Sequence, residues 1–165
     1  MKLSEGVEAA IHCTTMMAGL APGETLPAAA LSEVHGVSGS YLLKHLKALV
    51  GEGVLESVPG PNGGYRLARA PEKITLLDVV LAIEGRAPAF RCMEIRQGGP
   101  VKLPKAVYAK PCGINAAMLK AERAYRAALA ETSIADIVAD FHAEADPRAV
   151  AAVCAFTERH RRPQA

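Results

Sequence analysis

The sequence predicts a mainly α-helical protein with one small β-hairpin. Half of its 165 residues are hydrophobic, yet only 4% are aromatic and none is Trp, a composition that suits packed helices better than a β-sandwich. Apolar residues recur at helical spacing along most of the chain, and a glycine- and proline-rich stretch at 59–64 separates two short β-compatible runs. The length allows one domain with a hydrophobic core, or a small domain with an appendage.

Three helices are expected in the first third of the chain, at about 4–18, 27–35 and 38–51. Ser4 and Ser38 are suitable N-cap residues for the first and the third helix. A tight turn of three residues separates the second helix from the third. The third helix has a stripe of apolar residues that is typical of a core face, made up of Leu42, Leu43, Leu46, Leu49 and Val50.

A β-hairpin is expected next. Residues 54–58 and 65–68 are compatible with strands, and the segment 59–64 between them contains the Asn-Gly pair that is typical of hairpin turns. A further helix follows, capped by Thr75 and running to Ile83.

The segment 87–113 differs from the rest of the chain. Glycine and proline residues interrupt any regular element, which leaves a loop of about two dozen residues. Loops of this length in a compact domain are usually functional or disordered.

The last third of the sequence predicts helices again. A long helix is expected at about 115–130, and Thr132 or Ser133 caps another that runs to about residue 142. The remaining residues predict a last helix with a frayed end over 159–165.

Two helices joined by a short turn and followed by a hairpin have the order of a winged helix-turn-helix. On its outer side the third helix is expected to present Ser40, Tyr41, Lys44, His45 and Lys47, and it contains no acidic residue between Ser38 and Val50. Either element alone could be an ordinary solvated helix or turn, but together and in this order they favour binding to double-stranded DNA. The expected DNA contacts are Ser38, Ser40, Tyr41, Lys44, Lys47, Asn62, Gly63 and Arg66.

Overall charge adds little to this prediction. The net charge is only +2, and the first 91 residues carry nearly equal numbers of basic and acidic side chains, so a DNA-binding surface depends on where the basic residues lie. The N-terminal stretch has acidic residues within its apolar pattern, which is not typical of a signal peptide. No run reaches the about 18 apolar residues of a membrane span. We therefore expect a cytoplasmic protein with no membrane partner.

With these motifs the sequence resembles the Rrf2 family of bacterial transcription regulators, which includes IscR, NsrR and RsrR. The stretches that carry the resemblance are MKLSEGVEAAIHC at 1–13, Val37-Ser38-x-Ser40-Tyr41-Leu42-x-Lys44, Gly60-Pro61-x-Gly63-Gly64-Tyr65-x-Leu67-Ala68-Arg69 and Ile74-Thr75-Leu76-x-Asp78-Val79-Val80. A cysteine-bearing loop and a long helix follow, so the resemblance covers nearly the whole chain.

The resemblance implies a homodimer joined through the long helix, a palindromic operator and, as we expect, repression of transcription. It divides the chain into a winged helix-turn-helix DNA-binding domain (1–86), a sensor or cluster-binding loop (87–113), dimerisation helices (114–146) and a C-terminal tail (147–165). The loop of such regulators often holds an iron–sulfur cluster. Three closely spaced cysteines are common there, whereas this loop has only Cys92 and Cys112.

A [2Fe–2S] cluster needs four protein ligands, so two positions are left to fill. Glu8 and His12 lie four residues apart on the first predicted helix, and a carboxylate and an imidazole on one helix face can chelate iron. The pattern is similar to the RsrR branch, which implies that Glu8 and His12 of one subunit complete a [2Fe–2S] cluster held by Cys92 and Cys112 of the other. The implied metal ligands are thus Glu8, His12, Cys92 and Cys112.

Several alternatives stay open. Glu8 and His12 could be a solvated helix pair, and Cys92 and Cys112 could form a reversible disulfide as a thiol switch, or the loop could have no sensing role. Cys13 and Cys154 lie in apolar helical settings and are expected to be buried packing residues. An enzyme that uses a loop cysteine and a histidine is disfavoured because the chain lacks a phosphate-cradling loop, a nucleophile elbow and an acid–base constellation. No small-molecule substrate is expected.

Overall fold

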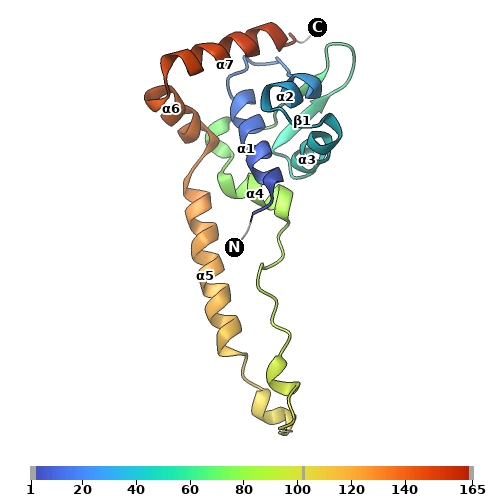
Figure 1. The fold of residues 1–165 in the computed structure, drawn as a ribbon, viewed down its shortest axis with the longest axis vertical. Coiled ribbons are helices and arrows are strands. Elements are labelled where there is room, and N and C mark those ends of the chain that lie inside the picture. Colours follow the sequence, from blue (N-terminus) through green and yellow to red (C-terminus); the bar gives the residue numbers. More distant parts are fainter. Residues whose placement is uncertain (1–2, 102, 164–165) are drawn as a thin grey trace. The chain divides into compact units, whose positions relative to one another are not determined.

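The computed structural model describes residues 3–101 and 103–163. These residues form seven α-helices, three short 3₁₀ helices and one antiparallel pair of strands, which confirms the predicted fold class (Figure 1). They divide into two compact units, one of residues 86–128 and one of residues 3–85 together with 129–163. None of the described helices is long and apolar enough to cross a membrane.

The helix-turn-helix is built from the first three helices, α1 (Glu5–Met17), α2 (Ala28–His35) and α3 (Gly39–Gly51). As predicted, Ser38 caps α3 by accepting a hydrogen bond from the backbone N–H of Tyr41, at 3.3 Å. Ser4 precedes α1, but its hydroxyl does not cap the helix. It donates instead to the Glu84 carboxylate, at 2.6 Å, and so ties the start of α1 to the end of another helix.

Strands β1 (Leu55–Val58) and β2 (Gly64–Leu67) form the wing. The turn between them is closed by the backbone N–H of Gly63, which donates to the Gly60 carbonyl at 2.9 Å. Pro61 and Asn62 therefore occupy the two corners of the turn. The Asn-Gly pair does not form the two-residue turn that its sequence suggests, because proline suits the first corner position and glycine the position after the second.

A short segment before α2 extends the wing. The backbone groups of Leu26 and Tyr65 donate to each other, at 2.8 and 2.9 Å, as an antiparallel bridge. A Cβ atom at Gly64 would lie 2.5 Å from the Leu26 carbonyl oxygen. Glycine at position 64 is thus required for the close approach of the two backbones.

Two later helices begin side by side. After the 3₁₀ helix Pro71–Lys73, helix α4 (Leu76–Glu84) starts with a capping box of Thr75 and Asp78, and α6 (Ile134–Glu144) starts with one of Ser133 and Asp136. A backbone bridge joins Thr75 to Ser133. Both caps are confirmed predictions, with Ser133 rather than Thr132 as the cap of α6.

Helix α7 (Pro147–His160) is the predicted last helix, but the frayed end expected after it is wrong for the described residues. Arg159 and His160 belong to α7, and Arg162 forms a backbone bridge with Thr25. In Figure 1 the end of α7 reaches the wing. Residues 164–165 of the predicted frayed end lie outside the described residues.

The core lies between the helices of the winged unit and the base of the hairpin. Leu43 was predicted to belong to it but is exposed, because it lies to the side of the stripe that faces α1 and α4. The core residues that are most fully buried are Ala10, Cys13, Leu26, Leu31, Leu42, Leu46, Leu49, Val54, Ile74, Val79 and Ile134.

The other unit consists of the predicted loop and most of α5 (Gly113–Glu131). The loop contains two short 3₁₀ helices, Ile95–Gln97 and Lys105–Tyr108. Its first residues are tied to α5, because Arg126 donates to the Arg86 carbonyl at 3.0 Å and Glu122 accepts from the Ala89 N–H at 3.0 Å.

Candidate functional site

Helix α3 has one exposed face that suits DNA. Its predicted contact residues Ser40, Tyr41, Lys44 and Lys47 are all exposed, as is Ser38 at its N-cap. Hydroxyl and ammonium groups on one helix face are the groups that proteins use to contact phosphates and base edges. The N-terminal end of α3 also directs backbone N–H groups outward, which favours anions.

His45 is a correction to the expected outer face of α3. It is buried, with 7% of its surface exposed, and its ring contacts Tyr41 edge-on at 4.5 Å between centroids. Its Nε2 atom has no hydrogen-bond partner among the described residues. Burial lowers the pKa of His45, and the charge of Lys44 lowers it further.

The position of His45 depends on a glycine in α1. A Cβ atom at Gly6 would lie 2.4 Å from Cε1 of the His45 ring, closer than any stable contact. Helices α1 and α3 can therefore pack this closely only because Gly6 has no side chain. Sequence reasoning missed this contact, since one glycine in a helix gives no signal of the ring that covers it.

The wing presents its predicted residues unequally. Asn62 is exposed at the tip, whereas Gly63 is buried. A Cβ atom at Gly63 would lie 2.2 Å from the Val58 carbonyl oxygen, so this position also requires glycine. Arg66 lies opposite Glu56 on the hairpin, and the two side chains form an ion pair at 3.0 Å. The Arg66 charge is thus partly balanced within the wing itself.

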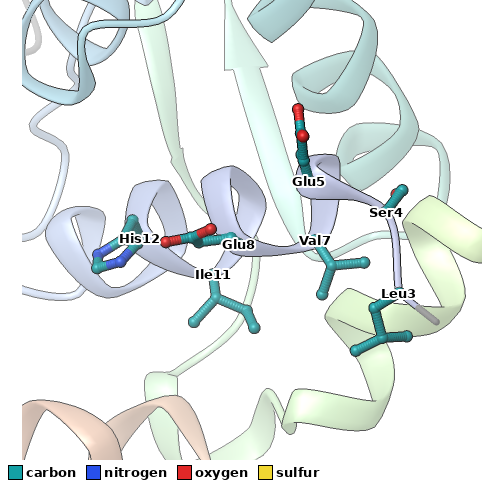
Figure 2. Close-up of a pocket in the computed structure, with 7 residues that line it drawn as sticks. All are labelled: Leu3, Ser4, Glu5, Val7, Glu8, Ile11 and His12. Atoms are coloured by element: carbon teal, nitrogen blue, oxygen red, sulfur yellow. The ribbon is translucent and has the colours of Figure 1, made fainter. Parts of the chain in front are cut away.

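Glu8 and His12 lie on the exposed side of α1, next to each other. Both side chains are exposed, while Val7 and Cys13 on the other side of the helix are buried. Figure 2 shows the Glu8 carboxylate directed along α1 toward the His12 imidazole, beside a pocket that Ile11 also lines. The spacing of four residues thus produces the shared face that the sequence predicted.

A second histidine lies beside His12. The ring of His35, the last residue of α2, is 5.5 Å from the His12 ring between centroids. Burial lowers the pKa of His35, and the charge of His12 lowers it further. His35 Nε2 is buried and has no hydrogen-bond partner among the described residues.

In the other unit, the fold brings Cys92 and Cys112 together although nineteen residues separate them. Their sulfur atoms and a carboxylate oxygen of Glu94 all lie within 4.8 Å of one another. Cys112 immediately precedes α5, and hydrogen bonds from the backbone N–H groups of Asn115 and Ile114 lower the pKa of its thiol. The charge of Arg96 and a hydrogen bond from Cys92 lower this pKa further.

Glu94 and Arg96 are parts of this site that sequence reasoning missed. Their side chains form an ion pair, and a hydrogen bond from Arg96 lowers the pKa of Glu94. Glu94 has a positive φ of 51°, an unusual conformation for a residue with a Cβ atom. Arg96 also lies over the Tyr108 ring, at 5.5 Å from its centroid. In an irregular loop, no periodicity could have identified this pair.

The two remaining cysteines differ from each other. Cys13 is fully buried in the core, and burial raises the pKa of its thiol to about 12, as suits a packing residue. Cys154 on α7 is exposed, so the prediction that it is buried is wrong for the described chain.

Comparisons of the sequence with known proteins identify related transcription regulators. The sequence model of the Rrf2 family, described as an iron-dependent transcriptional regulator, matches residues 3–140. YffB of Lactococcus lactis, which is classed by name with the HTH-type transcriptional regulators, is 36% identical over 137 residues, which cover 83% of this chain and 86% of YffB.

Two solved structures share the fold. IscR of T. potens superposes with a TM-score of 0.64 at 21% identity, covering 88% of this chain and 93% of IscR. CymR of B. subtilis, the global cysteine regulator of that organism, gives a TM-score of 0.63 at 19% identity, covering 84% of this chain and 97% of CymR.

Proposed function

Since the chain belongs to the Rrf2 family of transcriptional regulators, we propose that it is a homodimeric, redox-responsive DNA-binding regulator that holds a [2Fe–2S] cluster. The observation that carries the sensing part is the meeting of Cys92 and Cys112 at the start of α5. The narrower assignment to the RsrR branch stays a prediction.

The residues present fit such a cluster. Cys92 and Cys112 offer two sulfur ligands from one loop, and the environment of Cys112 favours the thiolate form that binds metals. Glu8 and His12 offer a carboxylate and an imidazole on an exposed helix face, and we assign them as the ligands that come from the partner subunit. When bound, the cluster supplies a centre that can be oxidised and reduced by one electron.

Helix α1 is suited to pass a signal from these ligands to the DNA-binding helix. It carries Glu8 and His12 on its exposed side, and Gly6, two residues before Glu8, packs against the ring of His45. A displacement of α1 therefore changes the packing of α3, which carries Lys44 and Lys47. This contact is the physical route by which we propose that the two sites are coupled.

The dimer is proposed to form along α5. Its apolar residues alternate at spacings of four and three and are largely exposed in the single chain, Ile114 at 67% and Met118 at 43%. Such spacing produces one apolar seam that requires a partner helix. The residues of this α5 seam are Ile114, Met118, Ala121, Tyr125 and Ala128. Two-fold symmetry of the dimer would match a palindromic operator.

The cluster is tested by purifying the full-length protein without oxygen. We expect a red-brown protein with about two iron and two sulfide per chain, whose visible absorption bleaches with dithionite. The His12→Ala variant should lose most of this iron, whereas His142→Ala, an exposed histidine on α6, should keep it. A wild-type protein that is colourless and free of iron would contradict the proposal.

A thiol switch is the second candidate, and the same closeness of Cys92 and Cys112 favours it. Peroxide would oxidise the two thiols to a disulfide and be reduced to two molecules of water, with the two thiol hydrogens ending in that water. Iron-free protein that changes its DNA affinity with peroxide, and loses this response in Cys92→Ser, would establish the switch in place of the cluster.

A further inference from the structure

The C-terminal segment after α7 binds the wing. The Nη1 group of Arg162 donates to two carbonyl oxygens of the wing turn, those of Pro61 and Gly63, each at 3.0 Å. The backbone of Arg162 also exchanges two hydrogen bonds with Thr25, at 2.9 and 3.0 Å. This segment lies beyond the residues matched by the family model, which end at 140.

Thr25 contributes a third bond to the same turn. Its hydroxyl donates to the Asn62 carbonyl at 3.2 Å, and its side chain is buried. Three successive carbonyl groups, those of Pro61, Asn62 and Gly63, are therefore held by donors from outside the hairpin. A two-stranded hairpin alone is only marginally stable, so these bonds restrict the position of its tip.

Arg162 is itself held in place by its neighbours. Arg161 forms ion pairs with Glu24, next to Thr25, and with Glu158 on the last turn of α7. On the same helix, Phe156 packs against the core and stacks on His160, with 4.1 Å between ring centroids. The guanidinium of Arg162 thus starts from a fixed backbone, which reduces the entropy lost when it binds the turn.

We propose that Arg162 is a positioning residue that fixes the wing turn for DNA binding. The proposal rests on the proposed DNA-binding function for its effect on affinity, but its effect on the wing does not need DNA. Because the side chain of Arg162 is already directed at the Pro61 and Gly63 carbonyls, its action is to order the tip that presents Asn62, and it makes no phosphate contact of its own.

The first experiment uses full-length protein without DNA. Hydrogen exchange of the Gly63 amide should become about tenfold faster in Arg162→Gln, since a charge-assisted pair of bonds to the turn is lost. Exchange in α1 and α3, and the Tm, should stay at wild-type values. The control is Arg159→Gln, which removes the same charge three residues earlier, on the last turn of α7, where Arg159 lies near the Phe156 ring at 5.9 Å. Unchanged exchange at Gly63, or faster exchange throughout the protein, overturns the proposal.

The second experiment measures binding to a duplex selected by the wild-type protein from random DNA. Arg162→Gln should bind about tenfold more weakly, with an unchanged slope of log affinity against log salt. Thr25→Val, which removes the bond to Asn62 from the other side, should have the same effect, and Arg159→Gln should bind like the wild type. A slope that falls by about 0.9 marks a direct phosphate contact and overturns the positioning role. If the wild type selects no duplex, the proposed function fails, while the exchange experiment still decides the role of Arg162.

Discussion

Lys44 and Lys47 lie on the exposed side of α3, in a stretch without acidic residues. Elsewhere in the wing region the cations have acidic or carbonyl partners, as with Arg66 and Glu56, or Arg69 and the Gly53 carbonyl. At the scale of single residues, the charge available for DNA is therefore concentrated on α3. This explains how a chain of net charge +2 can present a basic surface.

Reversing the charge of Lys44 should strongly weaken specific DNA binding. In Lys44→Glu we expect a loss of about 2 kcal/mol, or roughly 30-fold in Kd, because a phosphate attraction becomes a repulsion. Fluorescence anisotropy with the selected duplex measures it, and sedimentation checks that the oligomeric state is unchanged. Arg148→Glu, at the exposed start of α7, serves as the charge control, and equal DNA affinity in the two variants would contradict the assignment.

Some single residues have positions that could not be predicted from the sequence. Periodicity placed Leu42, Leu46 and Leu49 of α3 correctly in the core. It assigned His45 to the outer face because an imidazole is polar and lies at the edge of the apolar stripe. Its burial depends on Gly6, which is 39 residues earlier in the chain. Cys92 and Cys112 could be identified by type, whereas Glu94 and Arg96 join them through an irregular backbone.

At the scale of elements, the contact between α1 and α3 connects the proposed cluster ligands with the proposed DNA-binding helix. The His45 ring occupies the space that a side chain at Gly6 would need, so the two helices cannot shift past each other without repacking. The helix that carries Glu8 and His12 and the helix that carries Lys44 and Lys47 are thus joined by one close contact.

A side chain at position 6 should destabilise the protein. Gly6→Ala places a Cβ atom 2.4 Å from the His45 ring, and we expect the free energy of unfolding to fall by about 1–3 kcal/mol. Urea denaturation measures this change. In a His45→Ala background the added Gly6→Ala should cost little, since the ring is gone. Gly51→Ala, in a helix position with open space around it, is the control, and an equal loss in both backgrounds would contradict the contact.

Elements that depend on local signals were the ones that the sequence predicted best. Ser38, Thr75 and Ser133 cap their helices through residues three positions away, so the signal and its partner are read together. The segment that follows α7 is held mainly by residues far away in the sequence. Its order depends on Thr25 and Glu24 at the opposite end of the chain, which composition cannot reveal.

At the scale of the whole molecule, the α5 seam makes a second copy of the chain part of the proposed function. The seam follows one side of α5, and Glu122 and Arg126 at its edge bind the first residues of the loop. In the proposed dimer these contacts with the loop border the interface. The proposed ligand set likewise needs two chains, so dimerisation and cluster binding should fail together.

A charge in the seam should separate the subunits. Met118→Arg is expected to raise the dimer dissociation constant by at least about 100-fold, since an unpaired cation would be buried between two helices. Analytical ultracentrifugation measures the change. Ala127→Arg, an exposed position on the opposite side of α5, should remain dimeric, and a dimeric Met118→Arg variant would exclude the seam as the interface.

The bridge between Thr25 and Arg162 has a consequence for the newly made chain. Glu24 and Arg161, which flank the bridge, are 137 residues apart. At about 5–20 residues per second, the ribosome adds Arg161 roughly 7–27 s after Glu24. The proposed DNA-binding helices can fold during that delay, but the wing turn stays without the two hydrogen bonds that Arg162 donates. With the proposed function, the nascent chain therefore reaches its full affinity for DNA only after Arg162 has left the ribosome.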